Sequence, residues 1–396
     1  MNTADLLVVG AGRGQIPAIE AAQGLGLRVV VVDRDPSAPG MTLADQGLVV
    51  DVTDIDGVVR VARDFGVRGA LTMQSDLPVE AVGAVNDALG LRGVTADVAY
   101  RCSNKVAMRQ RFAAAGIPQP RFERVRSLSD AIDACNKIGY PCVVKAPDSS
   151  GSRGVARVES ASDVSAAFRE ARDIARDQTL IVEEFIAGVE FGAQTFSLRG
   201  TCVAVHIHDD EVSDPPHMVP VFHAYPSEFP DGVVQHAESV IASAIEALGV
   251  SDGPANVDAI LGVDGLVRII EVGARIGATC LPELTAHHTG IDWVSQAVLA
   301  AMGEAVTIGS NAERPAAAYI LASPNDGVLL DWSAPAALLA DWRLLEWEVT
   351  AERGQHVSAL KKGTDRIGKV VTTGVNRFDC VELARSARDG FAFVVR

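Results

Sequence analysis

Two carboxylates lie inside apolar segments of this 396-residue chain, where an unpaired charge would be costly. Asp258 lies in the run 257–260 and Glu271 ends the run 266–271, and we expect these runs to form adjacent strands joined by a turn. Carboxylates that face one way on neighbouring strands can share divalent cations and, through them, bind nucleotide phosphates. Arg275 could instead neutralise the carboxylates in a structural salt bridge, or hold a phosphoryl group during its transfer.

A lysine and a loop of small residues form a second candidate element. Lys145 ends an apolar strand expected over residues 140–144, and residues 149–154 read Ser-Ser-Gly-Ser-Arg-Gly. A lysine at the end of a strand offers a fixed positive charge to a phosphate, and backbone N–H groups of such a loop can close over the last phosphate. This is not a Walker loop, because the lysine precedes the glycines; a surface hairpin with a solvated lysine is the alternative. The loop residues predicted to contact phosphate are Ser150, Gly151 and Ser152.

A third segment suits an exposed hinge around a nucleotide base. The apolar run 180–182 leads into Glu183 and Glu184, and then through Ile186 to Glu190. Backbone groups of such a hinge could pair with the edge of an adenine, while the downstream carboxylate could hold ribose hydroxyls. A plain turn at the edge of a sheet explains the same residues and is the alternative.

The first hundred residues alternate strand-like and helix-like segments. Such alternation predicts a small parallel sheet that is covered by helices on both faces. We expect its strands over residues 6–9, 28–33, 46–51 and 67–73.

A glycine-rich turn follows the first of these strands. Gly10, Gly12 and Gly14 precede a helix, and Asp33 ends the second strand, about where an acid binds ribose in a dinucleotide fold. The spacing is G-x-G-x-G rather than the full G-x-G-x-x-G, and a tight turn between strand and helix needs glycine in any case. We therefore expect a structural or substrate-lining turn rather than a dinucleotide site.

The rest of the chain divides into a central and a closing part. A helix over residues 104–115 ends at Gly116, ahead of two prolines that cannot continue it, and a strand-rich region with the candidate site follows. Strands of the closing part are expected over residues 317–321, 356–360 and 391–395. We expect domains over residues 1–102, 103–304 and 305–396.

In this order the motifs resemble those of the ATP-grasp superfamily, and the likeness runs from the first residue to about Gly303. The resemblance implies a mixed α/β and α+β fold, with a Rossmann-like N-terminal domain, two lobes that grip ATP and a small C-terminal domain. It implies that Lys105 and Lys145 contact ATP beneath the small-residue loop. It also implies an adenine hinge at Glu183, Glu184 and Ile186, with Glu190 as the ribose ligand.

The resemblance assigns the magnesium ions to Asp258 and Glu271, and the arginine of the final motif to Arg275. Two positions depart from the usual pattern. The family often has asparagine two residues after the second carboxylate, whereas this chain has Gly273, as is familiar in the amino-acid ligase branch. The first metal acid is aspartate where glutamate is more usual, which shortens its reach. We expect a working site, because both carboxylates and all the cationic groups are present.

The activity that the resemblance implies is ATP-dependent carbon–nitrogen ligation with formation of ADP. A substrate carboxylate would attack the γ-phosphorus of ATP, and an amine would displace phosphate from the acyl phosphate while Arg275 stabilises the oxyanion. Expected cofactors are ATP and magnesium, with manganese as a substitute, and expected substrates are a small carboxylate, such as an amino acid, and an amine. A carboxylating enzyme that activates bicarbonate and a non-catalytic ATP-binding protein are the alternatives.

Four histidines gather in the middle of the chain, around Asp209 and Asp210. They could line the substrate pocket, bind zinc or lie in a solvated loop, and their spacing is irregular and lacks a clear fourth ligand. They are His206, His208, His217 and His223.

Composition argues against two classes of partner. The formal net charge of −16 would repel nucleic acids and anionic lipids. No apolar run approaches the ~20 residues of a membrane helix, and the first residues lead into a strand without the basic segment of a signal peptide, so we expect a cytosolic protein. The six cysteines include no C-x-x-C pair and predict reduced, mostly buried thiols. A homodimer is the commonest assembly of soluble enzymes.

Overall fold

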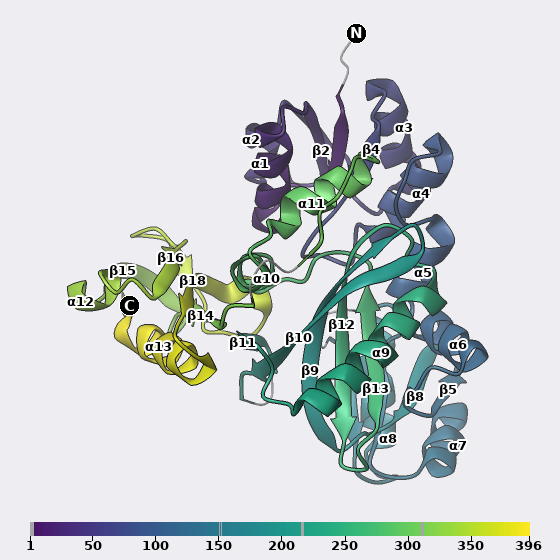
Figure 1. Ribbon diagram of the computed structural model, residues 1–396. Coiled ribbons are helices and arrows are strands. Elements are labelled where there is room, and N and C mark those ends of the chain that lie inside the picture. The colour runs from purple at the N-terminus through teal and green to yellow at the C-terminus, as the bar shows by residue number, and fades with distance from the viewer. Residues whose placement is uncertain (1–3, 150, 152, 215–217, 310–312) are drawn as a thin grey trace. The chain divides into compact units, whose positions relative to one another are not determined.

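The computed structural model describes residues 4–149, 151, 153–214, 218–309 and 313–396 (Figure 1). The chain forms two compact units, each built from segments that are separated in the sequence. The first comprises Met1–Val205, Gln235–Gly277 and Asp292–Ile308; the second comprises His206–Val234, Ala278–Ile291 and Gly309–Arg396. The division into three domains after residues 102 and 304 stays a prediction.

The first unit begins with the parallel sheet that the strand–helix alternation predicts. Neighbouring strands run parallel in the order β3-β2-β1-β4. Leu6 and Leu7 point to opposite faces of β1 and are both fully buried, so both faces of the sheet are covered. The strands are β1 (Leu6–Val9), β2 (Val29–Asp33), β3 (Gln46–Val49) and β4 (Gly69–Leu71), and the first helices are α1 (Ile16–Gly24), α2 (Gly40–Leu43), α3 (Ile55–Phe65) and α4 (Val79–Leu89).

A helix from much later in the chain completes the core of this sheet. α11 (Trp293–Ala301) packs against α1 and β4, and its apolar side chains share one buried cluster with those of α1, β1 and β2 (Figure 1). Gly69 permits the close approach, because a Cβ at this position would lie 2.7 Å from the carbonyl oxygen of Ala301.

A second sheet in the first unit is antiparallel and has the order β5-β8-β6-β7. Helices α7 and α8 pack against it through a buried apolar cluster, and a capping box of Ser127 and Asp130 fixes the start of α7. These elements are β5 (Phe122–Val125), α7 (Leu128–Ile138), β6 (Cys142–Lys145), β7 (Val155–Val158), α8 (Val164–Ile174) and β8 (Leu180–Glu184).

A third group in the first unit carries the two predicted metal carboxylates. Strands β9, β12 and β13 are antiparallel neighbours in the order β13-β12-β9. The group contains α5 (Ala96–Ser103), α6 (Lys105–Ala115), β9 (Gly188–Leu198), most of α9 (Asp231–Leu248), β12 (Gly253–Gly262) and β13 (Val267–Gly273). β10 (Thr201–Val212) begins in this unit and continues in the second.

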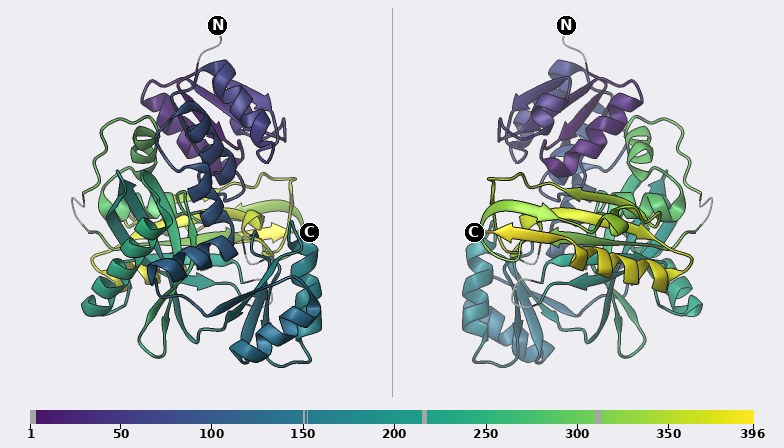
Figure 2. Two further views of the ribbon diagram at one scale, coloured as in Figure 1. Left: turned by 90° about the vertical axis from the view of Figure 1, so that its right-hand side faces the viewer. Right: turned by 90° about the vertical axis from the view of Figure 1, so that its left-hand side faces the viewer.

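The second unit has a mainly antiparallel core. Five strands of an eight-stranded sheet have the order β10-β11-β14-β18-β16, and a three-stranded sheet has the order β17-β15-β19. Helix α13 lies along β14 and β18 of the larger sheet (Figure 2). Apolar side chains from these elements and from α10 form one buried cluster. The elements are β11 (Pro220–Tyr225), α10 (Leu281–Thr289), β14 (Ala316–Ala322), β15 (Gly327–Ser333), α12 (Ala336–Leu339), β16 (Leu344–Val349), β17 (His356–Val357), β18 (Arg366–Thr373), α13 (Arg377–Gly390) and β19 (Ala392–Val395).

Most expected elements are found, and the differences lie at their ends. The strand expected over residues 356–360 stops at Val357, because Ala359 donates its N–H to the side chain of Asp326 instead of to a neighbouring strand. The helix expected from residue 104 begins at Lys105, since Asn104 is its N-cap. All six cysteines are free and five are buried, as predicted. Among the described residues, none of the helices combines the length and apolar character needed to span a bilayer.

Candidate active site

Asp258 and Glu271 are directly opposite each other on neighbouring strands. The register of β12 and β13 pairs Asp258 with Glu271, and the pairing shifts by one residue immediately after Asp258. Directly opposed residues of an antiparallel pair have Cβ atoms about 4.5–5.5 Å apart on one face. The structure therefore brings the two predicted metal carboxylates together on one side of the sheet.

An amide beside this pair was missed by sequence reasoning. Asn256 donates from Nδ2 to Asp258 Oδ1 at 3.0 Å and accepts at Oδ1 from Gln194 Nε2 at 2.6 Å. Gln194 in turn accepts from the N–H of Gly277 at 2.9 Å. Asn256 precedes Asp258 by two residues, so the period of a strand already places both on one face. That spacing is the signal that could have found it.

Arg275 is paired with Asp76, another residue that the sequence did not indicate. Its Nη2 lies 2.7 Å from Asp76 Oδ1, and 11% of the arginine side chain is exposed. Burial acts to lower the pKa of Arg275, but the nearby carboxylates, Asp76 first, raise it by more. The guanidinium therefore stays charged close to Asp258 and Glu271.

Gly273 has a steric role between these groups. A Cβ at residue 273 would lie 2.7 Å from Asp76 Oδ1 and 3.2 Å from the central guanidinium carbon of Arg275. A side chain here would push Asp76 away from the arginine. The pairing of β12 and β13 sets Asn256 opposite Gly273, so an amide reaches this region from the neighbouring strand.

Lys105 joins the carboxylate pair to the base of the small-residue loop. Its Nζ donates to Glu271 Oε1 at 2.8 Å and to the carbonyl oxygen of Ser149 at 2.7 Å. It is the first residue of α6, whose N-cap Asn104 accepts hydrogen bonds from the N–H groups of Val106 and Ala107. The helix start therefore fixes the lysine backbone.

Lys145 belongs to a buried trio of charges. Its Nζ lies 2.7 Å from Glu183 Oε2, and Arg109 Nε lies 2.9 Å from the other oxygen of the same carboxylate. Arg109 also donates to the carbonyl oxygens of Ile269 and Ile270 in β13. Two cations share one carboxylate, so the trio carries a net positive charge.

Burial and pairing together set the protonation of this trio. Burial raises the pKa of Glu183, but the charges of Arg109 and Lys145 lower it by more, to about 2. Burial lowers the pKa of Lys145, and Glu183 opposes that effect. Arg109 was missed by the sequence analysis, although it follows Lys105 by four residues and thus lies on the same helix face.

The loop after Lys145 is closed at its base by a hydrogen bond from the N–H of Ala146 to the carbonyl oxygen of Gly154. Gly154 has a φ of +65° and its Cβ position lies 2.9 Å from Ile174, so glycine is needed there. Gly151 is exposed, with a φ of +67°. The predicted contact residues Ser150 and Ser152 lie outside the described residues.

The predicted hinge follows the end of β8. β8 ends at Glu184, whose carboxylate pairs with Arg121 at 3.1 Å, and Ile186 lies in the short connection to β9. Glu190 is exposed in β9. The side chain of Glu183 points away from this connection into the buried trio. Only the backbone of Glu183 could therefore pair with the adenine of a nucleotide.

Two parts of the chain match known families. Residues 138–283 match the ATP-grasp domain, and residues 319–396 match the L-amino acid ligase C-terminal domain 2. A formate-dependent phosphoribosylglycinamide formyltransferase of Ignicoccus hospitalis is 30% identical over 293 residues, which cover 68% of this chain and 68% of that protein. The chain belongs to the ATP-grasp superfamily. All predicted site residues except Lys105 lie within the matched range 138–283.

Solved structures with the same fold include two ligases. Phosphoribosylglycinamide synthetase from Anaerococcus prevotii is 27% identical with a TM-score of 0.84, and each chain is covered completely. L-amino acid ligase from Bacillus licheniformis is 21% identical with a TM-score of 0.83, again over 100% of both chains. The predicted ATP-grasp fold is confirmed. The predicted enzyme class, ATP-dependent carbon–nitrogen ligases that form ADP, is confirmed as well.

The glycine-rich turn of this ATP-grasp chain is held by its own residues. The N–H of Ala11 donates to Asp33 Oδ2 at 2.8 Å, and Gln15 Nε2 donates to the carbonyl oxygen of Met73 at 2.7 Å. Gly10 has a φ of +96°, which favours glycine. Asp33 thus binds the backbone of the turn. A structural role therefore explains both the glycines of the turn and the acid at the end of β2.

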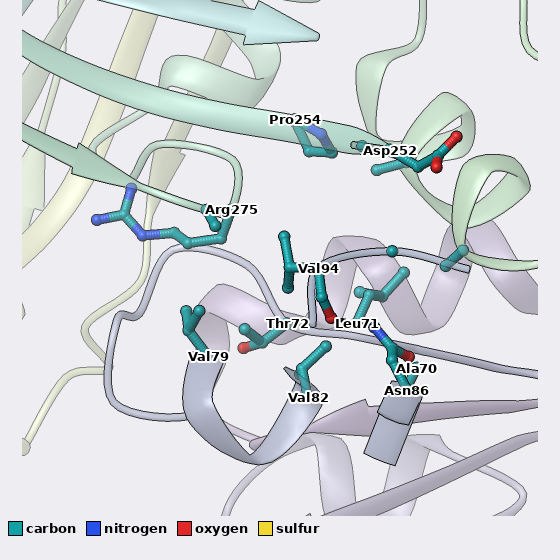
Figure 3. A pocket seen from close by; sticks show the side chains of 15 residues that line it. Ala70, Leu71, Thr72, Val79, Val82, Asn86, Val94, Asp252, Pro254 and Arg275 are labelled. Atoms are coloured by element: carbon teal, nitrogen blue, oxygen red, sulfur yellow. Dashed lines mark hydrogen bonds between the residues drawn. The ribbon is translucent and has the colours of Figure 1, made fainter. Parts of the chain in front are cut away.

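A cavity of about 50 Å³ lies beside Arg275 (Figure 3). Its wall is mostly apolar, with Thr72 Oγ1 and Asn86 Oδ1 as buried polar atoms that have no hydrogen-bond partner among the described residues. The guanidinium of Arg275 points away from Thr72, Val79 and Val82 (Figure 3). Substrate pockets span roughly 300–1,000 Å³, so this cavity has room only for water.

The histidines of the second unit form two neighbouring groups. His208 and His223 both contact Asp210, and burial lowers the pKa of His206 to about 4. The ring of His288 stacks on Tyr225 at a centroid distance of 4.5 Å. None of these described histidines lies in a solvated loop, so the interpretation of His206, His208 and His223 as loop residues is wrong. His217 lies outside the described residues.

Proposed function

We propose that this ATP-grasp ligase activates a small carboxylic acid as an acyl phosphate and joins it to an amine, with an amino acid as one substrate. One observation carries the proposal: Asp258 and Glu271 form a direct cross-strand pair, with Lys105 bound to one carboxylate and Arg275 charged close to both. This arrangement concentrates charge where phosphoryl transfer requires it.

The carboxylate pair fits magnesium. Both residues offer oxygen ligands, which hard divalent cations prefer, and Asp258 is exposed while Glu271 is partly buried. Bound magnesium would neutralise negative charge on the phosphates of ATP. Lys105 occupies one oxygen of Glu271 and would exchange that contact for a phosphate oxygen.

The remaining groups act on the reacting atoms of the substrates. An oxygen of the substrate carboxylate attacks the γ-phosphorus, the bond from that phosphorus to the bridging oxygen breaks, and ADP leaves. The amine nitrogen then bonds to the acyl carbon, and phosphate departs with the former carboxylate oxygen as the amine loses a proton. Arg275 would stabilise the oxyanion, while the buried trio of Lys145, Arg109 and Glu183 supplies a positive charge for the phosphates.

Two family matches support the substrate class. The C-terminal match is to a domain of L-amino acid ligases, and the relatives named formate-dependent formyltransferases also take a carboxylic acid. An amino acid or another small acid is therefore the proposed acyl donor, and an amine the acceptor.

Phosphate release tests the proposal directly. The purified chain, ATP and magnesium are combined with a grid of amino-acid pairs, formate, bicarbonate and amines, and products are weighed by mass spectrometry. A pair-dependent signal with a product lighter by one water than its two parts supports amide ligation. Turnover that needs bicarbonate as the acid would move the chain to a carboxylating reaction, and ATP binding without turnover across the grid would contradict the proposal.

Variants connect that activity to the proposed site. Removing one preorganised charge typically costs about 10²–10³ in rate, so Arg275→Gln and Glu271→Gln should nearly abolish turnover. Arg268→Gln is the matched control, because Arg268 also lies at β13 but pairs with the exposed Asp264. Equal rates for Glu271→Gln and the control would contradict the metal assignment.

A further inference from the structure

Three side chains meet on one face of the sheet in the second unit. The register of β10 and β11 pairs Asp210 with His223, and His208 precedes Asp210 by two residues, which puts it on the same face of β10. Asp209 points to the other face, where it accepts hydrogen bonds from Ser227 and Arg377. Strand geometry therefore brings two imidazoles and one carboxylate together from two neighbouring strands.

Both imidazoles converge on the same oxygen. His208 Nδ1 lies 2.6 Å from Asp210 Oδ1, and His223 Nδ1 contacts that oxygen as well. The two rings are nearly perpendicular, with centroids 5.2 Å apart, and one ligand atom from each of the three residues lies within 4.8 Å of the others. Tyr225 packs edge-on against His208, which limits rotation of its ring.

The Nε2 nitrogens of both rings make no hydrogen bond within the described residues. His208 Nε2 and His223 Nε2 are buried and have no hydrogen-bond partner in the described part of the chain. A metal bound at Nδ1 of each ring leaves the ring proton on Nε2, so these nitrogens are not the ligand atoms. The observation that points to a bound cation is therefore the convergence of both Nδ1 atoms on one carboxylate oxygen.

We infer that His208, Asp210 and His223 form a binding site for a divalent transition-metal ion of the zinc class, distinct from the carboxylate pair proposed for magnesium. Two imidazole nitrogens and a carboxylate oxygen are the ligand set of open zinc sites, whereas magnesium prefers oxygen ligands alone. The inference does not depend on the proposed ligase reaction.

The contact between His208 and Asp210 needs only a small adjustment to hold such an ion. Ligands of tetrahedral zinc lie about 2.0–2.1 Å from the metal, and hence roughly 3.3 Å from one another. The separation of His208 Nδ1 and Asp210 Oδ1 would open from 2.6 Å by less than 1 Å, as the ion takes the place of the Nδ1 proton and that proton moves to Nε2. The Asp210 side chain is about one-fifth exposed, so solvent can supply the ion and a fourth ligand.

Cobalt titration of the full chain tests the site. The protein is treated with a chelator, saturated with magnesium and titrated with Co²⁺, followed by competition with Zn²⁺. We expect one equivalent of Co²⁺ with the strong visible absorption of a tetrahedral site, displacement by Zn²⁺, and a higher melting temperature of the wild-type chain with Zn²⁺. His208→Gln and His223→Gln should each weaken binding about a hundredfold or more.

His287→Gln is the matched control, because His287 lies in the same unit but pairs with Glu346, at 2.8 Å, instead of with Asp210. Its Co²⁺ affinity should equal that of the wild type. If the cluster variants fail to fold, paramagnetic NMR of the cobalt-loaded wild type tests the site instead. Two shifted, exchangeable imidazole N–H signals would support it. Absence of these signals, no tetrahedral cobalt in the wild type, or unchanged binding in the folded double variant would each overturn the inference.

Discussion

At the scale of single residues, Gly273 shows how a departure from a family pattern can be compensated. The family often has asparagine at this position. In the structure a Cβ at this position would displace Asp76 from Arg275, and Asn256 supplies an amide from the opposite strand. The glycine therefore leaves room for the pair of Asp76 and Arg275 beside the proposed metal ligands.

Gly273→Asn, which restores the common family residue, should lower turnover rather than raise it. A displacement of the order of 1 Å at a reacting group can cost about 10² in rate, and we expect a loss of that size in kcat. Gly24→Ala is the control, because nothing lies within 4 Å of its Cβ position. Turnover by Gly273→Asn equal to that of the control would refute the steric argument.

Glu183 should contribute to stability more than its neighbour Glu184. Glu183→Gln leaves Arg109 and Lys145 buried with unpaired charge, which typically costs about 3–5 kcal/mol. Glu184→Gln removes a partly exposed pair with Arg121 and should cost less than about 1 kcal/mol. Thermal and urea unfolding of the two variants measure the difference, and equal stability would contradict the role of the trio.

The lowered pKa of Glu183 predicts that the stability of the protein depends on pH in acid. The pKa of this carboxyl in the folded chain is about 2, below the ordinary value of 4.5, so its contribution to stability is complete above pH 4.5 and is lost as the pH falls towards 2. The gap in melting temperature between wild type and Glu183→Gln should therefore narrow over this range. A gap that stays constant from pH 5 to pH 3 would contradict the assignment.

Sequence reasoning at this scale found the residues whose chemistry is unusual for their surroundings. Asp258 and Glu271 stand out as acids in apolar strands, and the register confirms that they are neighbours. Asp76 and Arg109 were missed because each acquires its partner through a contact distant in the sequence, which residue type alone does not reveal.

At the scale of elements, the start of α6 positions a predicted ATP contact. Asn104 accepts hydrogen bonds from two N–H groups of the first turn, and Lys105 follows it directly. Loss of an N-cap typically costs about 1 kcal/mol, and fraying of this turn would release the lysine from Glu271. The cap therefore affects both stability and the site.

Asn104→Ala should lower stability by about 1 kcal/mol and weaken ATP binding several-fold. Asn376→Ala is its control, because Asn376 caps α13 in the second unit through a comparable hydrogen bond to the N–H of Asp379. The control should show a similar loss of stability without a loss of ATP affinity. Urea unfolding and calorimetric ATP titration measure the two effects, and parallel changes in ATP affinity would contradict the positional role.

The strands and helices themselves were largely predictable, because apolar period and turn residues are local properties. The parallel sheet, α6 with its end before Gly116, and β14 follow from such patterns. Strand lengths were less predictable: β17 ends after two residues because Asp326, distant in sequence, takes the N–H of Ala359.

At the scale of the whole molecule, each compact unit combines segments that are far apart in the chain. The second unit adds residues 206–234 and 278–291 to the C-terminal segment, and its core includes Phe222, Leu284 and Val370 from all three. A pattern read along the chain cannot show this, because the association depends on contacts between distant segments.

A chain ending at residue 308 should therefore be poorly soluble. It would lack β14 and β18, and with them the partners of Phe222, Tyr225 and Leu284, which are fully or almost fully buried in the complete chain. Exposed apolar surface of this kind promotes aggregation. We expect increased binding of a hydrophobic dye and loss of soluble protein on gel filtration; a soluble fragment with cooperative unfolding would contradict the shared core.

The packing of α11 on the N-terminal sheet also has a consequence for biosynthesis. The strands β1 to β4 are complete once Leu71 has been made, but the helix that closes one side of their core begins at Trp293. At about 5–20 residues per second, the ribosome takes roughly 10–45 s to add the intervening segment. During this interval α1 already packs in this cluster, but the part of the core that α11 covers stays open to solvent until the chain's own helix arrives.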